Sequence, residues 1–192
     1  MNDRLPVDNQ FSLPLRLIFT DLDGSLLDHH SYSFKPALSM LTELELRGIP
    51  VIPITSKTMA ELIPLRDQLE NRHPFIIENG AAIYIPRDYF SQQPENSLNV
   101  ADYWVINNAP HRDHWLKILA DETAEFTDEY QTFDSVYKQF GVAGIAKLTG
   151  LNTNMAELAN KRNHSEPVHW TGTESRKTLF IEKMRSLGAT VL

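Results

Sequence analysis

The first ninety residues alternate between short apolar runs and a segment with helical periodicity. The apolar runs cover 15–19, 49–54 and 74–80, and each ends at a turn. Runs that are apolar on both faces predict short buried strands. Residues 37–46 place apolar side chains at helical spacing, and Gly48 follows as a helix stop. Strands that alternate with helices predict an α/β protein with a parallel, Rossmann-like sheet and right-handed crossovers.

Local signals refine this picture. Thr58 and Glu61 have the Thr-x-x-Glu spacing of a capping box, which predicts a helix from there to about Leu69. Residues 81–85 follow the third apolar run closely, so we expect them to pair back as a hairpin arm. Residues 1–14 are polar and contain two prolines, and we expect a loose tail.

The pattern changes near residue 90. Residues 91–97 are polar and irregular, so we place a domain boundary there. Beyond it the pattern predicts strands at 103–106 and 168–170 and helices at 111–123, 136–148, 154–162 and 174–187. We therefore expect a core domain over 15–90 and a smaller α+β domain over 91–192.

Composition narrows the classes of function. The chain of 192 residues is 42% hydrophobic, which is enough for one large or two small globular domains. Its net charge of −7 argues against a nucleic-acid partner, because phosphate backbones require a basic face. No cysteine is present, so catalysis must use oxygen or nitrogen groups. Without a signal peptide or an apolar run of ~20 residues, we expect a cytoplasmic protein with no membrane partner; its oligomeric state stays open.

Two carboxylates, Asp21 and Asp23, directly follow the first predicted strand. Residues two apart in an extended segment point the same way, and Gly24 permits a sharp turn after them. Paired carboxylates repel each other, which favours a bound cation, and Mg²⁺ prefers such oxygen ligands. We therefore expect both aspartates to bind Mg²⁺. A calcium loop of the EF-hand type is the alternative, but that loop needs glycine at its sixth position and flanking helices.

The same pair predicts phosphoryl transfer. Asp21 can attack a phosphate ester and form an aspartyl-phosphate, while Asp23 protonates the leaving alcohol and later activates water. Thr55, Ser56 and Lys57 follow the second predicted strand and supply hydroxyl and cationic groups for the phosphoryl oxygens.

These segments carry a family resemblance. The strand followed by Asp21–Ser25 resembles the first motif of the haloacid dehalogenase superfamily of phosphatases, and Thr55 stands at the phosphate-binding hydroxyl of its second motif. Glu78–Ala81 resembles the turn after the third strand in the branch with a large cap, which implies a substrate-binding role for Asn79. The resemblance implies a Rossmann-like core with a smaller α+β cap.

Within this branch the chain is most similar to the mannosyl-3-phosphoglycerate phosphatases. The shared segments are Phe19–Asp28, Pro53–Thr58, Ile77–Gly80 and Ala146–Leu151. Residues 162–167 resemble a family segment that reaches toward the glycerate end of the substrate, so Arg162 and Ser165 are expected to bind it. An arginine can hold a carboxylate through two parallel hydrogen bonds, although a solvated helix end is the alternative for Arg162.

The resemblance implies a magnesium-dependent phosphatase that hydrolyses a small phosphorylated sugar or sugar acid, such as mannosyl-3-phosphoglycerate to mannosylglycerate. A phosphomutase is an alternative. After its cap the family also supplies a lysine and a second acidic loop, and the chain ends at Leu192 before either motif. We therefore expect a core that is incomplete at its C-terminal side, with residues 15–19 at an exposed edge. A truncated enzyme and a catalytically impaired binding module are both consistent with this pattern.

Overall fold

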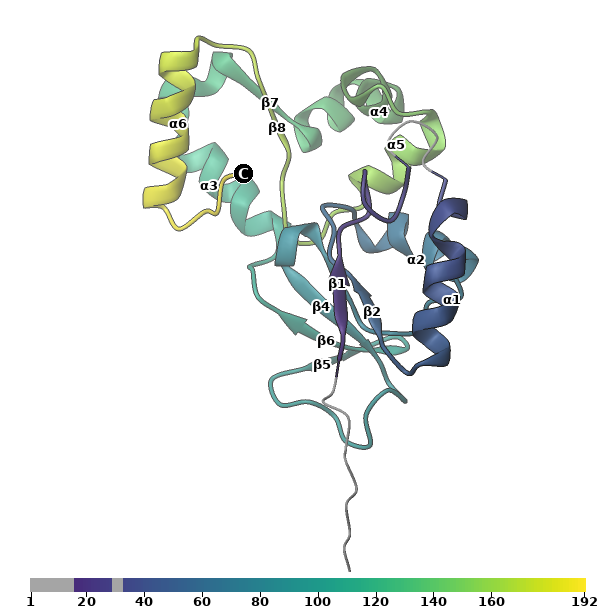
Figure 1. The fold of residues 1–192 in the computed structure, drawn as a ribbon. Coiled ribbons are helices and arrows are strands. Elements are labelled where there is room, and N and C mark those ends of the chain that lie inside the picture. Colours follow the sequence, from purple (N-terminus) through teal and green to yellow (C-terminus); the bar gives the residue numbers. More distant parts are fainter. Residues whose placement is uncertain (1–15, 29–32) are drawn as a thin grey trace, which may run out of the picture.

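The computed structural model describes residues 16–28 and 33–192 (Figure 1). The tail expected at 1–14 lies outside the described residues. The first half contains β1 (Ile18–Thr20), η1 (Lys35–Ala37), α1 (Leu38–Leu46), β2 (Val51–Pro53), α2 (Met59–Gln68), β3 (Phe75–Ile77), η2 (Glu78–Gly80), β4 (Ala82–Pro86), β5 (Leu98–Val100) and β6 (Tyr103–Asn107). The second half contains α3 (Arg112–Glu122), η3 (Ala124–Glu129), β7 (Tyr130–Thr132), α4 (Phe133–Thr149), α5 (Thr153–Asn160), β8 (Val168–Trp170) and α6 (Glu174–Ser186).

The strands of the first half form a mixed sheet. β1 and β2 pair in parallel, with Phe19 opposite Ile52. A parallel bridge between Ile54 and Ile76 connects β2 to β3, and the antiparallel order β3-β4-β6-β5 follows. The prediction of an α/β fold with parallel strands is confirmed, and so is the hairpin formed by β3 and β4.

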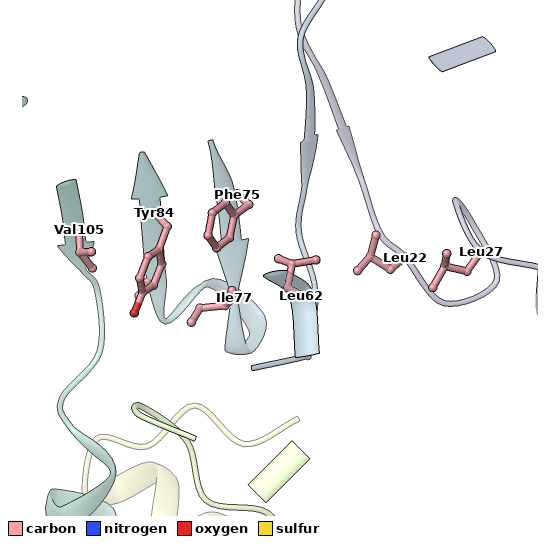
Figure 2. Packing of buried hydrophobic residues seen from close by; sticks show 8 residues of the cluster. Leu22, Leu27, Leu62, Phe75, Ile77, Tyr84 and Val105 are labelled. Carbon is pink, nitrogen blue, oxygen red and sulfur yellow. The ribbon is translucent and has the colours of Figure 1, made fainter. Parts of the chain in front are cut away.

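A cluster of buried apolar side chains holds this sheet against α2 and the acidic loop (Figure 2). Phe75 on β3 is fully buried and stacks on Tyr84 of β4 with 5.2 Å between ring centroids. Leu62 of α2 and Leu22 of the acidic loop are also fully buried in this cluster. Burial of Leu22 anchors the loop, which leaves the aspartates on either side of it on the surface.

β1 corrects one expectation. A buried strand was predicted over 15–19, yet Leu17, Ile18 and Phe19 are 41%, 38% and 55% exposed. The reason is position: within the described part of the chain β1 pairs with β2 alone and lies at the edge of the sheet. The exposed edge expected there is present. α1 also has no fully buried residue.

The boundary near residue 91 does not match the sheet. β5 and β6 continue the core sheet beside β4, and Val105 of β6 packs in its apolar cluster. The polar residues 91–97 belong to the connection between β4 and β5, because a hairpin loop and a domain linker share the same polar composition. We therefore propose that the core extends to about residue 108 and that residues 109–192 form the cap.

The cap has two apolar clusters. One joins α3, η3 and α6 through Leu119, Phe126, Phe180 and Met184. The other joins α4 and α5 through Phe133, Val136, Ile145 and Ala156. The antiparallel pair β7–β8 connects the two parts, and α4 and α5 lie above α2 of the core (Figure 1). In residues 16–28 and 33–192, no helix combines the length and apolar character needed to cross a bilayer.

Candidate functional site

A hollow of about 500 Å³ lies at the carboxyl ends of β1, β2 and β3. Its lining consists of Phe19, Thr20, Asp21, Asp23, Ile54, Thr55, Ser56 and Asn79. Five of these residues were predicted as site residues from separate parts of the sequence: Asp21, Asp23, Thr55, Ser56 and Asn79. The fold brings them together, and their chemical roles stay predictions.

The acidic loop is a tight turn. The amide of Leu27 donates to the carbonyl of Leu22 at 2.8 Å, and the amide of Gly24 donates to the carbonyl of Leu27 at 3.0 Å. Gly24 has a φ of 74°, a conformation that glycine adopts without steric cost. Because buried Leu22 separates them, Asp21 and Asp23 both remain exposed at the hollow.

Lys57 pairs with one of the two carboxylates. Its Nζ lies 2.8 Å from Oδ2 of Asp23, and the two side chains are 16% and 39% exposed. Lys57 does not line the hollow itself, although it was predicted to bind phosphate. The ion pair places a cation beside the acidic pair, which lowers the repulsion between Asp21 and Asp23.

The loop between β2 and α2 is held by its own hydrogen bonds. The amide of Lys57 donates to Oγ1 of Thr55 at 3.1 Å, and Thr55 is almost fully buried. Thr58 then caps α2: its Oγ1 accepts from the amide of Glu61 at 3.1 Å, and the Glu61 carboxylate accepts from the amide of Thr58 at 2.8 Å. The predicted capping box is confirmed. The N-terminus of α2, which favours anions, thus starts directly after the hollow.

Asn79 reaches the hollow through an unusual turn. Glu78 and Asn79 have φ values of 46° and 60°, in the left-handed region that non-glycine residues rarely adopt. Their amides donate to the carbonyls of Lys57 and Thr55 at 3.1 and 2.9 Å. These bonds hold the turn against the loop between β2 and α2, as expected of strained backbone at a functional site.

Arg162 comes from the cap and lies at the same loop. Both of its terminal nitrogens are 3.3 Å from the carbonyl oxygen of Ser56, and one donates to Oγ of Ser165 at 2.9 Å. The side chain is 13% exposed, so the alternative of a solvated helix end is wrong. Burial lowers the pKa of the Arg162 guanidinium, and the nearby carboxylate of Glu78 opposes this shift.

Sequence reasoning missed one residue that connects the two domains. Glu78 was identified only as part of a turn, yet its side chain is fully buried and faces the cap residues 163–165. The signal that could have indicated this is a glutamate at the end of an apolar strand. Such a carboxylate must find several donors in order to be buried.

The donor chemistry of the hollow fits Mg²⁺. Asp21 and Asp23 are hard oxygen ligands that share one hollow. Magnesium is often held by only one or two protein carboxylates, with water and substrate phosphate as its other ligands. In the described ranges 16–28 and 33–192, no group of three or more histidine, aspartate or glutamate side chains is arranged for a metal ion. We propose the two aspartates as the residues that would hold the ion.

Comparison with known proteins supplies family information. Residues 18–101 match a family model described as haloacid dehalogenase-like hydrolase. A relative from Methanococcoides burtonii, named glucosyl-3-phosphoglycerate/mannosyl-3-phosphoglycerate phosphatase, is 37% identical over 175 residues, covering 90% of this chain and 62% of the relative. A relative of the same name from Persephonella marina is 36% identical over 156 residues, covering 79% of this chain and 54% of the relative.

The chain therefore spans less than two thirds of the length of either of these relatives. Among solved structures, a crystal structure of a protein from Thermotoga maritima matches with a TM-score of 0.52 and 18% identity, covering 90% of this chain and 62% of that chain. This likeness concerns the fold. The matched model and the two relatives show that residues 18–101 are similar to the haloacid dehalogenase-like hydrolases.

Proposed function

We propose that this chain forms the nucleophile-bearing part of a magnesium-dependent phosphatase that acts on a small phosphorylated sugar or sugar acid. The observation that carries the proposal is the hollow in which Asp21, Asp23, Thr55 and Ser56 meet at the end of the sheet. Nucleophile, proton-transfer group and phosphate-binding groups for one reaction come from two adjacent strands. The names of the two relatives support the class of substrate.

The proposed reaction has two steps. The Asp21 carboxylate attacks phosphorus, the bond from phosphorus to the leaving oxygen breaks, and Asp23 gives that oxygen a proton. Water then attacks the phosphorus of the aspartyl-phosphate, Asp23 accepts the proton of this water, and phosphate leaves with Asp21 restored. Thr55 and Ser56 stabilise the phosphoryl oxygens from the loop before α2. Bound Mg²⁺ would supply the charge neutralisation that phosphoryl transfer requires.

Arg162 supports a substrate with a second anionic group. The guanidinium lies at Ser56, and its Nε has no hydrogen-bond partner among the described residues. A guanidinium that is mostly buried and incompletely hydrogen-bonded favours an anionic partner, and a carboxylate is such a partner. We therefore propose mannosyl-3-phosphoglycerate as substrate, with Arg162 and Ser165 binding its glycerate carboxylate and Asn79 binding beside the phosphate. The products would be mannosylglycerate and phosphate.

The test is phosphate release from mannosyl-3-phosphoglycerate by the gene product that contains this chain, with Mg²⁺ or with a chelator. We expect release with Mg²⁺ only, and a loss of roughly a thousandfold or more in Asp21→Asn, because the covalent route is removed. Asp88→Asn is the matched control, as Asp88 is exposed on a loop outside the hollow.

Three results would contradict the proposal. Full activity in Asp21→Asn would remove the nucleophile assignment. Formation of a phosphate isomer without free phosphate would identify a phosphomutase. Binding of Mg²⁺ and phosphate without any turnover would identify a binding module.

A further inference from the structure

Glu78 belongs to the core, but its carboxylate accepts hydrogen bonds from residues of the cap. Its Oε1 accepts from the amide of Asn163 at 2.8 Å. Its Oε2 accepts from the amides of His164 and Ser165 at 3.1 and 2.8 Å, and from Oγ of Ser165 at 2.5 Å. Three successive amides and one hydroxyl therefore donate to a single carboxylate that lies more than eighty residues earlier in the sequence.

The burial of this group requires these contacts. The Glu78 side chain has 0% exposure, and a buried carboxylate without partners is strongly unfavourable. Hydrogen bonds to an ionised acceptor are about twice as strong as neutral ones, and here four of them converge. The guanidinium of Arg162 adds a positive charge, with one nitrogen 3.9 Å from Oε2. The donors of the loop 162–165 thus offset the cost of burying the Glu78 carboxylate.

The strained turn explains how Glu78 reaches the cap while its neighbour reaches the hollow. Glu78 and Asn79 both have left-handed backbone. Asn79 lines the hollow, whereas the side chain of Glu78 meets the loop of the cap. A turn of this kind costs free energy and persists where its surroundings require it. Here the turn directs Asn79 to the hollow and the preceding residue, Glu78, to the cap loop.

The loop that Glu78 holds carries Arg162. The same loop places the guanidinium at the carbonyl of Ser56, and Ser165 bonds both to Glu78 and to Arg162. Any movement of residues 163–165 would therefore move Arg162 relative to the hollow. A second contact supports the docking, because Oγ1 of Thr58 donates to the carbonyl of Leu158 at 2.9 Å.

We infer that Glu78 is a positioning residue whose carboxylate fastens the cap loop 162–165 to the end of β3 and thereby sets the place of Arg162 over Ser56. The inference rests on the proposed function, in which Arg162 binds the carboxylate of the substrate. It adds that this loop, although part of the cap, is held in place by a residue of the core.

The first experiment measures amide hydrogen exchange in the 192-residue chain and needs no activity. In Glu78→Gln, one oxygen is replaced by an NH₂ group that faces amide donors, so we expect exchange at Asn163, His164 and Ser165 to accelerate about tenfold or more. Glu129→Gln is the matched control, because this carboxylate accepts from Nε of Arg176 at 2.7 Å and both residues belong to the cap. It should leave exchange at 163–165 unchanged.

Equal exchange at 163–165 in Glu78→Gln and in the control would overturn the inference. If Glu78→Gln does not fold, Glu78→Asp takes its place, since the shorter side chain keeps the charge but cannot span all three amides. Faster exchange at 163–165 is again the supporting result, and unchanged exchange the opposing one.

The second experiment separates positioning from a purely structural role. Binding of 3-phosphoglycerate and of inorganic phosphate is measured by calorimetry with Mg²⁺ in the wild type and in Glu78→Gln. We expect the Kd of 3-phosphoglycerate to rise about tenfold more than that of phosphate, because only the former carries a carboxylate for Arg162. An equal rise for both ligands would overturn the positioning role. Failure of the wild type to bind either ligand would count against the proposed function, and the exchange measurement would still decide on Glu78.

Discussion

Thr58 offers a direct measure of how strongly core and cap are joined. Its side chain is fully buried and makes two kinds of hydrogen bond. Oγ1 accepts from the amide of Glu61 inside the capping box of α2, and it donates to the carbonyl of Leu158 at the end of α5. Removing the hydroxyl therefore removes one cap and one contact between the domains.

The expected cost follows from these two terms. Loss of an N-cap hydroxyl costs about 1 kcal/mol, and loss of a buried hydrogen bond costs about another 1 kcal/mol. Thr58→Ala also loses a methyl group, so Thr58→Ser serves as its reference. We expect the free energy of unfolding of Thr58→Ala to lie about 2 kcal/mol below that of Thr58→Ser.

Thr132 provides the matched pair. It caps α4 in a capping box with Ser135, whose amide donates to Oγ1 of Thr132 at 3.0 Å, and this box lies within the cap. Thr132→Ala should lie only about 1 kcal/mol below Thr132→Ser. Urea unfolding followed by far-UV circular dichroism gives both differences. If the two agree within about 0.3 kcal/mol, the hydrogen bond to Leu158 contributes nothing, and the additivity used here is refuted.

Two further predictions concern the sheet and the acidic pair. Phe75→Ala should lower the free energy of unfolding by about 3–5 kcal/mol, because Phe75 is fully buried. Phe19→Ala should lower it by under about 1 kcal/mol, because Phe19 on the edge strand β1 is 55% exposed. Equal losses in urea unfolding would contradict this expectation. Lys57→Met should lower kcat/KM for phosphate release about ten- to a hundredfold through loss of a charged contact at Asp23. Lys138→Met, which removes an exposed ion pair of the cap, should leave activity unchanged.

Local signals predicted the elements well. The capping box at Thr58 and the helix stop at Gly48 depend on hydrogen bonds between residues a few positions apart, so the sequence contains all that is needed. The position of Asp21 and Asp23 directly after a strand was also predicted, and their chemical roles stay predictions. Parallel strands bring their carboxyl ends to one edge, which is why the hollow could be anticipated from separate segments.

Long-range relations were less predictable. The sequence does not show that Lys57 pairs with Asp23, because that contact joins residues 34 positions apart. It also gives no reason to expect β5 and β6 in the same sheet as β4, since the polar connection before them is typical of both loops and linkers. The apolar pattern of β1 predicted a buried strand for a related reason, because apolar residues alone do not distinguish a central strand from an edge strand. Only the family resemblance led us to expect an exposed edge there.

The hydrogen bonds between Glu78 and the cap have a consequence for which substitutions the cap loop tolerates. Its partners are chiefly main-chain amides, which every residue except proline supplies. These bonds themselves therefore do not depend on which side chains stand at 163 and 164. Docking through Glu78 thus restricts the main chain of the loop and excludes proline from it, while the burial of His164 is a separate restriction on one side chain.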